Sequence, residues 1–229
     1  MVEADATTLS ISGFFGAGLT AESDNLILRA LDAVKAKPHA VTLEKNLPVS
    51  AGIGGGSANA AAVLRMCGVD DLSTAVSLGA DVPVCLHSKT AHMTGIGEDI
   101  RLLPDMEPLQ ALLVNPRVAV STGSIFKAFD ASPNIRETPR PIKQKGGLLS
   151  RALDGRNDLE PIAIAQAPVI GDVLRMLSSQ NGCQLARMSG SGATCFGIFE
   201  NDSALLKAEA AIRAGAPDWW CEAVVLGGA

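Results

Sequence analysis

Several features that mark other classes of protein are scarce or missing in this sequence. It has no tyrosine, and aromatic residues make up only 3% of the chain. No apolar run is long enough to span a membrane, and no charged-then-apolar signal peptide opens the chain. The net charge is −5 and no basic run exceeds two adjacent positions, which argues against nucleic acid as the main partner. We therefore expect neither a membrane nor a nucleic acid to be a partner.

Cysteine and histidine also lack the patterns of disulfide or metal sites. The five cysteines are odd in number and contain no C-x-x-C pair. The three histidines lack the spacing of metal ligands. These absences predict reduced, mostly buried thiols in a cytoplasmic protein without a zinc site.

The remaining composition is that of an alanine-rich α/β protein. Its 229 residues are 47% hydrophobic, enough for one large domain or two small ones. Residue periodicity and turn signals predict strands at 9–12, 40–47, 112–114, 118–120 and 219–226, two more beside 189–192, and a hairpin at 91–103. The same signals predict helices at 26–34, 58–67, 71–78, 122–129, 147–153, 158–166, 169–179 and 202–214. The polar, proline-rich residues 131–146 are predicted to form a mobile loop.

The stretch from Pro48 to Ala62, P-V-S-A-G-I-G-G-G-S-A-N-A-A-A, carries the strongest functional signal. Four of its glycines lie within five positions and lead directly into a helix-forming run. Glycines allow a ligand to approach the backbone, and a helix start offers unpaired N–H groups and a positive dipole end. The pattern favours a phosphate site over a glycine loop that is merely capped by Ser57.

Two common phosphate loops do not fit this stretch. A Walker A loop needs a lysine after its glycines, and no lysine lies between Lys45 and Lys89. A dinucleotide fingerprint starting at Gly52 or Gly54 would have Ser57 or Asn59 in place of its last glycine. The phosphate loop therefore belongs to another class.

Two other stretches resemble ligand sites. Asp81 lies between small residues and an apolar run that contains Pro83. It is a candidate catalytic carboxylate, although a helix N-cap or a turn is the commonest role for such a residue. Ser189–Gly192 is too rich in glycine for regular pleating, which predicts either a ligand-facing bulge or a plain hairpin turn. Taken together, the three stretches indicate a phosphotransferase.

These motifs resemble the GHMP kinases (galactokinase, homoserine kinase, mevalonate kinase and relatives). The branch they resemble most phosphorylates the 2-hydroxyl of 4-diphosphocytidyl-2-C-methyl-D-erythritol with ATP in non-mevalonate isoprenoid precursor biosynthesis. The resemblance rests on S-D-N-L-I-L-R-A (23–30), L-P-V-S-A-G-I-G-G-G-S-A-N-A-A-A (47–62), L-G-A-D-V-P-V-C-L (78–86), M-T-G-I-G-E (93–98), S-T-G-S-I-F-K (121–127), R-N-D-L-E-P (156–161) and M-S-G-S-G-A-T-C-F-G (188–197). The motifs span nearly the whole chain.

The resemblance implies the fold and the roles of individual residues. The fold would be α/β (α+β), with an N-terminal ATP-binding domain related to ribosomal protein S5 domain 2 over residues 1–115, truncated at its start, and a C-terminal GHMP kinase domain over 116–229. ATP would bind Pro48, Val49, Ser50, Ala51, Gly52, Ile53, Gly54, Gly55, Gly56, Ser57 and Ala58, with Asn25 and Lys45 near the nucleotide. Asp81 would be the catalytic aspartate, and the cytidine-diphosphate substrate would lie beside Thr122, Phe126, Gly190, Ser191 and Gly192.

The expected chemistry is Mg²⁺-assisted phosphoryl transfer. Such catalysis depends mainly on positioning and charge neutralisation, and the Ser57 hydroxyl is a candidate Mg²⁺ ligand. Asp81 would orient the attacking alcohol and accept its proton late in the reaction. The resemblance leaves a monomer and a homodimer both open.

The sequence departs from the branch at its start. Relatives begin earlier, with a strand that carries a lysine partner for the aspartate, followed by a G-Y-H segment, and neither has a counterpart here. One interpretation is the kinase with a misplaced or fragmentary start, and another is a weak or inactive nucleotide-binding remnant. A third, another GHMP small-molecule kinase, is disfavoured by G-A-D-V-P and N-D-L-E-P.

Overall fold

The structure is a computed structural model that describes residues 1–22, 24–103, 106–132 and 146–227. The loop predicted at 131–146 therefore lies mostly outside the described residues. Within the described residues, no helix is long and apolar enough to cross a membrane.

The described residues form two compact units. One consists of Met1–Val49 and Gly54–Pro104, and the other of Ser50–Ile53 and Asp105–Gly228. The glycine stretch therefore contributes its residues 50–53 to the second unit and its remainder to the first. The predicted domain division after residue 115 stays a prediction.

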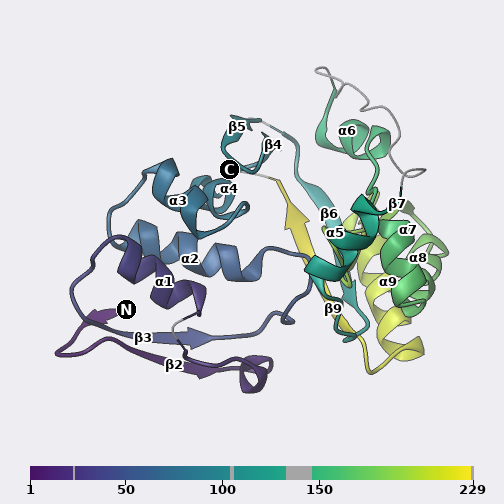
Figure 1. Ribbon diagram of the computed structural model, residues 1–229. Coiled ribbons are helices and arrows are strands. Elements are labelled where there is room, and N and C mark those ends of the chain that lie inside the picture. Colours follow the sequence, from purple (N-terminus) through teal and green to yellow (C-terminus); the bar gives the residue numbers. More distant parts are fainter. Residues whose placement is uncertain (23, 104–105, 133–145, 228–229) are drawn as a thin grey trace. The chain divides into compact units, whose positions relative to one another are not determined.

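The first unit contains a small mixed sheet of strand order β1-β3-β2 (Figure 1). Its strands are β1 (Val2–Glu3), β2 (Thr8–Ser12) and β3 (His39–Glu44). β2 and β3 run parallel, so the chain needs a crossover between them, and this connection contains η1 (Gly16–Gly18) and α1 (Leu26–Ala33). The strand predicted at 9–12 is confirmed, and the one predicted at 40–47 ends earlier, at Glu44.

Helices and a hairpin complete the first unit. They are α2 (Gly55–Met66), α3 (Leu72–Leu78), α4 (Val82–His87), β4 (Ala91–Thr94) and β5 (Asp99–Leu102). α2 packs against both α1 and α4, and its buried face includes Ala60, Ala61 and Leu64. Small alanine side chains allow these helices to approach closely. The core of the unit forms where this face meets residues such as Leu31 and Val41.

The second unit is built on an antiparallel sheet of strand order β7-β8-β6-β9 (Figure 1). Its elements are β6 (Leu109–Asn115), α5 (Thr122–Asp130), α6 (Leu148–Asp154), α7 (Glu160–Gln166), α8 (Val169–Ser178), β7 (Cys183–Met188), β8 (Cys195–Phe199), α9 (Asp202–Gly215) and β9 (Trp220–Leu226). α8 and α9 both pack on the sheet. The buried residues of α8 include Ile170, Val173 and Leu177, spaced three and four apart as a one-sided helix requires.

The strand predicted at residues 118–120 is wrong. These residues follow β6 without forming a strand. The N–H of Arg117 donates to Asn115 Oδ1 (2.7 Å), and Arg117 has a φ of 57°, so the chain turns directly after β6. Val120 is instead buried in the core of the unit.

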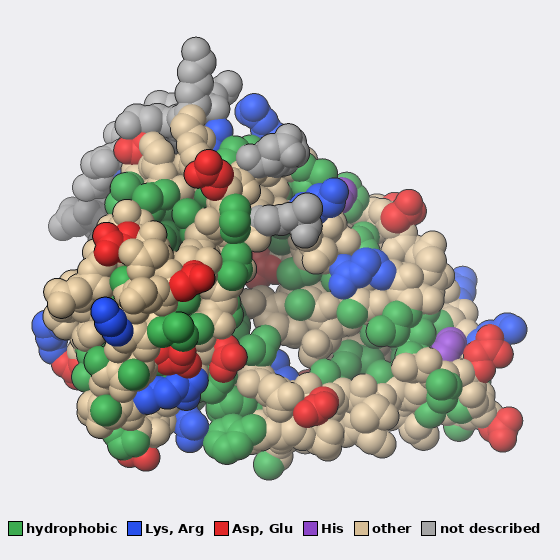
Figure 2. All heavy atoms as spheres, turned by 180° about the vertical axis from the view of Figure 1, so that it is seen from behind, with side chains coloured by type: hydrophobic (Ala, Val, Ile, Leu, Met, Phe, Trp, Pro, Cys, Tyr) green, Lys and Arg blue, Asp and Glu red, His purple; other side chains and the backbone are tan. Residues whose placement is uncertain are grey.

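Charges of both signs are dispersed over one face of the molecule (Figure 2). On the face drawn in Figure 2, lysine and arginine side chains lie scattered among aspartates and glutamates. The extended basic stripe that marks nucleic-acid binding is not visible on that face.

Two buried thiols of the second unit are expected to make stability depend on alkaline pH. Burial raises the pKa of Cys195 from 9.0 to about 12 and that of Cys221 to about 11. The unfolded chain loses these protons near pH 9 while the folded chain keeps them, so the free energy of unfolding should fall as pH rises from about 9 to 11. We expect a decline of about 1 kcal/mol per pH unit for each thiol.

Urea unfolding at a series of pH values from 8 to 11 measures this decline. The double variant Cys195→Ala/Cys221→Ala should lose that part of the slope. If the free energy of unfolding fell equally with pH in both proteins, the two buried thiols would not be the cause of the decline.

Candidate active site

The glycine stretch ends in a helix start with unpaired backbone donors. Gly54 is the N-cap of α2, and no side chain caps the helix. The first main-chain bond of the helix runs from the N–H of Ala58 to the carbonyl of Gly54. Among the described residues, the N–H groups of Gly55, Gly56 and Ser57 have no hydrogen-bond partner.

Lys45 brings a positive charge to this helix start. Its backbone is fixed directly after β3, where its N–H donates to the Ser12 carbonyl (2.8 Å) and its carbonyl accepts from the N–H of Phe15 (2.9 Å). A Cβ atom on Gly55 would lie 3.0 Å from Lys45 Nζ, so the ammonium group lies against the backbone that opens α2.

The Lys45 ammonium is held there without a counter-ion. The residue is 7% exposed, and none of the described carboxylates pairs with its side chain. Burial lowers the pKa of Lys45 because water no longer solvates the charged form fully. A desolvated cation beside unpaired N–H groups at the positive end of a helix dipole forms a site for an anion.

Asn25 lies close to the same place. It is the N-cap of α1: its Oδ1 accepts from the N–H of Ile27 (3.0 Å), and its Nδ2 donates to the Thr20 carbonyl (3.1 Å). The next residue, Leu26, has its Cδ1 3.3 Å from the position of a Cβ on Gly56. The side chain of Asn25 thus serves α1, and its predicted nucleotide contact stays a prediction.

Asp81 stands at the start of α4 but does not cap it. It occupies the N-cap position with helical φ/ψ, and its exposed carboxylate makes no hydrogen bond to any described residue. Pro83, in the first turn of the helix, has no N–H for a capping side chain to accept from. The carboxylate therefore remains available to a ligand.

Neighbouring elements hold Asp81 near the glycine stretch within the first unit. Cys85, one turn after Asp81, has its Sγ 4.0 Å from the position of a Cβ on Gly54. Arg65 of α2 donates to the carbonyls of Cys85 (2.7 Å) and Leu86 (3.2 Å), which joins α4 to α2. The β4–β5 turn packs against the residue before Asp81, since a Cβ on Gly97 would lie 2.0 Å from the Ala80 carbonyl oxygen.

The second unit brings residues 50–53 of the glycine stretch against the Ser189–Gly192 loop. Gly52 has a φ of 70°, and a Cβ there would lie 2.4 Å from the Ser189 carbonyl oxygen, so only glycine fits. Ser189 Oγ donates to the Gly52 carbonyl (2.8 Å), and the N–H of Thr194 donates to the Ala51 carbonyl (3.2 Å). The Ser189–Gly192 loop and its flanking residues thus bind the backbone of residues 50–53, and the predicted contact of this loop with a ligand stays a prediction.

Two predicted substrate residues also lie in this unit. Thr122 Oγ1 and Ser191 Oγ form a hydrogen bond of 2.8 Å. Phe126, one turn after Thr122 on α5, is 49% exposed, which leaves its ring free to stack on a ligand.

The sequence did not reveal a role for every residue that holds these loops. The Arg65 side chain binds the backbone of α4 at Cys85. The Asn157 and Glu160 side chains bind the backbone of Met188, at the start of the Ser189–Gly192 loop. The motif R-N-D-L-E-P contains two of the three, but its letters gave no indication of which atoms they would contact.

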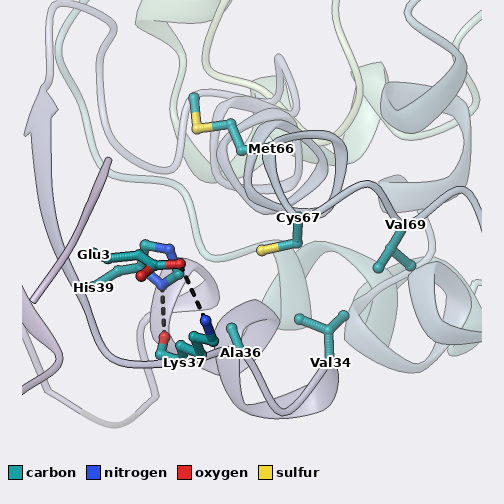
Figure 3. Close-up of a pocket in the computed structure, with 8 residues that line it drawn as sticks. All are labelled: Glu3, Val34, Ala36, Lys37, His39, Met66, Cys67 and Val69. Carbon is teal, nitrogen blue, oxygen red and sulfur yellow. Dashed lines mark hydrogen bonds and ion pairs between the residues drawn. The ribbon is translucent and has the colours of Figure 1, made fainter.

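A pocket of about 280 Å³ lies elsewhere in the first unit (Figure 3). It is lined by Glu3, Val34, Ala36, Lys37, His39, Met66, Cys67 and Val69. Its polar groups are already engaged, since Lys37 pairs with Glu3 (3.6 Å) and His39 Nδ1 bonds the Lys37 carbonyl (2.6 Å). Met66 ends α2 while the glycine stretch begins it, about 18 Å away at 1.5 Å per residue.

Comparison with known proteins assigns the chain to a family. The family model "GHMP kinases N terminal domain" matches residues 25–89, and "GHMP kinases C terminal" matches residues 133–218. The 4-diphosphocytidyl-2-C-methyl-D-erythritol kinase of Parvibaculum lavamentivorans is 44% identical over 99% of this chain and 84% of its own length. The enzyme of the same name from Paracoccus denitrificans is 47% identical over 94% of this chain and 79% of its own length.

The chain belongs to the GHMP kinases. A solved 4-(cytidine 5'-diphospho)-2C-methyl-D-erythritol kinase matches this GHMP kinase with a TM-score of 0.77 and 31% identity, covering 100% of this chain and 85% of the other. A homoserine kinase from Cytophaga hutchinsonii matches with a TM-score of 0.68 and 20% identity over 97% of this chain and 82% of the other, which shows the shared fold. The two-domain α/β GHMP kinase fold predicted from the motifs is confirmed.

The contact at Gly52 generates a testable prediction. In Gly52→Ala the new Cβ would overlap the Ser189 carbonyl oxygen, so the variant should lose both stability and affinity for ATP. Gly68→Ala is a matched control, because Gly68 has the same φ of 70° with nothing within 4 Å of its Cβ position.

Chemical unfolding and calorimetric titration with ATP measure the two effects. Backbone strain alone should destabilise Gly68→Ala by roughly 1–2 kcal/mol. Gly52→Ala should lose clearly more stability than that. Equal losses of stability in the two variants would show that the close approach of Gly52 to Ser189 does not contribute to stability.

Proposed function

We propose that this GHMP kinase transfers the γ-phosphoryl group of ATP to the 2-hydroxyl of 4-diphosphocytidyl-2-C-methyl-D-erythritol, a step in non-mevalonate isoprenoid precursor biosynthesis. The observation that carries the proposal is the identity of 44–47% over nearly the whole chain to kinases named for this substrate. The proposal is also supported by the unpaired Lys45 ammonium at the glycine-rich start of α2.

The donor phosphates would bind at the start of α2. The N–H groups of Gly55, Gly56 and Ser57 and the Lys45 ammonium would neutralise phosphate charge. Their positions are fixed by the fold before ATP arrives, so little reorganisation accompanies the reaction. The rest of the stretch from Pro48 to Ala58 would surround the phosphates.

Mg²⁺ is the expected metal, and the oxygen donors of the first unit fit it. The Ser57 hydroxyl is a hard oxygen ligand, and it is not engaged with another described residue. Mg²⁺ commonly takes one or two protein oxygens together with phosphate oxygens and water. When bound, it would neutralise charge on the phosphates of ATP.

Asp81 would act on the acceptor. Its carboxylate would accept a hydrogen bond from the 2-hydroxyl and orient that oxygen towards the γ-phosphorus. As the new O–P bond forms, the bond from the γ-phosphorus to the bridging oxygen breaks and ADP leaves. The hydroxyl proton passes to Asp81 late in this step.

The acceptor's cytidine end would bind in the second unit. The Phe126 ring is exposed for stacking, and the Thr122–Ser191 hydroxyl pair offers a donor and an acceptor. Gly190 and Gly192 would present their backbone to the substrate on either side of Ser191, since the space of a side chain at each is filled by Gly52 and Met188.

A remnant that binds ATP without transferring phosphate is the second candidate. It is favoured by the lack of a cationic partner for Asp81 among the described residues. An uncompensated carboxylate would repel the phosphoryl group that it must approach. A coupled assay that detects ADP formed from ATP and the cytidine-diphosphate substrate distinguishes the candidates, because only a kinase turns over.

The cellular location and the oligomeric state of the enzyme are also proposed. All five cysteines are free thiols, which supports a cytoplasmic location. We propose a small-molecule substrate and a monomer or homodimer.

Asp81→Ala tests the catalytic assignment. The variant should lose about 100- to 10,000-fold in kcat, because it lacks the group that orients the alcohol and accepts its proton. Its affinity for ATP should persist, since the phosphate donors are untouched. Asp70→Ala, which removes an exposed aspartate outside the site, should behave as wild type. Unchanged turnover in Asp81→Ala would refute the role of Asp81.

Lys45→Met tests the phosphate site separately from catalysis. Loss of a charged hydrogen-bond donor should weaken ATP binding about 10- to 100-fold. The free energy of unfolding should be maintained or rise, because a desolvated charge is replaced by an apolar side chain of similar length. Calorimetry and urea unfolding measure both, with Lys89→Met at an exposed position as control. Intact ATP affinity in Lys45→Met would contradict the proposed site.

A further inference from the structure

Two side chains of the R-N-D-L-E-P motif hold the backbone at the end of β7 and in the Ser189–Gly192 loop that follows it. Asn157 Nδ2 donates to the carbonyls of Met188 (2.8 Å) and Gly190 (2.7 Å). Glu160 Oε2 accepts from the N–H of Met188 (2.8 Å). Three hydrogen bonds therefore join this motif to one short piece of backbone.

The side chain of Asn157 is fixed by its own segment, and the backbone of Glu160 is fixed by a helix start. Asn157 Oδ1 accepts from the N–H of Leu159 (3.0 Å), which directs the amide nitrogen of Asn157 towards the loop. Glu160 is the first residue of α7, and both residues are partly buried. A side chain held at one end by its own segment can impose a position on what it binds at the other.

The loop that they hold contacts two groups of proposed site residues. Ser189 Oγ donates to the Gly52 carbonyl (2.8 Å), within the stretch proposed to surround the ATP phosphates. Ser191 Oγ bonds Thr122 Oγ1 (2.8 Å), within the proposed acceptor site. Asn157 and Glu160 are not among the proposed site residues, so their effect on the reaction would pass through the loop.

We propose that Asn157 and Glu160 are positioning residues for phosphoryl transfer, which set the Ser189–Gly192 loop and through it Gly52 and Ser191. This inference rests on the proposed function. The sheet already fixes β7 and β8 by pairing Met188 with Cys195. The pairing of these strands does not fix the loop between them, and Asn157 binds that loop at Gly190.

The experiment separates positioning from stability with variants at Asn157 and Glu160 and a matched control. Asn157→Asp keeps an oxygen for the N–H of Leu159 but turns the donor facing two carbonyls into an acceptor. Glu160→Ala removes the acceptor for the Met188 N–H, and Glu160→Gln restores an oxygen there. Asn201→Asp is the matched control: Asn201 caps α9 through Oδ1 (2.9 Å to the Ala204 N–H), its amide donates to Glu200 Oε1 (3.3 Å), and it does not contact the loop.

Three quantities are measured for each variant. They are the melting temperature, backbone hydrogen exchange over residues 188–194, and the steady-state kcat and KM for ATP and for the cytidine-diphosphate substrate. We expect faster exchange in this segment and kcat/KM lower by about 10- to 100-fold in Asn157→Asp and Glu160→Ala, with raised KM values. Glu160→Gln should recover most of the loss, and Asn201→Asp should match wild type.

A lower melting temperature with unchanged KM values and unchanged exchange over 188–194 would overturn the proposal, because it would mean that the side chains serve stability alone. If wild type itself forms no ADP, the proposed function fails. Positioning is then judged by exchange over 188–194 and by calorimetric affinity for ATP: faster exchange with weaker binding in Asn157→Asp supports it, and wild-type values overturn it.

Discussion

The proposed site depends on a buried cation at the positive end of a helix. Lys45 is almost inaccessible and lies without a carboxylate partner against the first residues of α2. Two positive features are thereby held together, and neither is neutralised by another described residue. Such an arrangement is unfavourable in the free protein, as the lowered pKa of Lys45 reflects. A ligand of high negative charge would offset this unfavourable electrostatic energy, which is the physical basis of the proposed phosphate site.

The neighbouring fold keeps this cation in place. Both backbone polar groups of Lys45 are hydrogen bonded, so the residue cannot move outward without breaking the connection from β3 to the loop that follows β2. The alanine-rich face of α2 is buried against α1 and α4, which fixes the helix start from behind. The stability supplied by these apolar contacts offsets the unfavourable electrostatics, as is common at functional sites.

Local patterns in the sequence predicted most elements and indicated the glycine stretch as a candidate phosphate site. The glycine-to-alanine transition predicted α2 from residue 58, and the helix begins three residues earlier, at Gly55, because two of the glycines join its first turn. The features that the sequence did not predict are set by contacts between residues far apart in the chain. The apolar residues 118–120 resembled a strand, but the turn at Arg117 and the burial of Val120 decided otherwise. The burial of Lys45 and the hydrogen bonds from Asn157 to Met188 and Gly190 likewise depend on segments far apart in the chain. The periodicity of the sequence contains no signal for such contacts.

Asp71 and Asp81 show why local pattern could not decide the question of catalysis. Each precedes a short helix, and from the letters alone each is a plausible N-cap. Asp71 has extended backbone angles, and its carboxylate accepts from the N–H groups of Ser73 (3.3 Å) and Thr74 (2.9 Å). This carboxylate is therefore engaged as the N-cap of α3. Asp81 has helical angles, and Pro83 removes one of the N–H groups that a cap would use. Pro83 therefore removes one local partner for Asp81, whose carboxylate has no hydrogen-bond partner among the described residues.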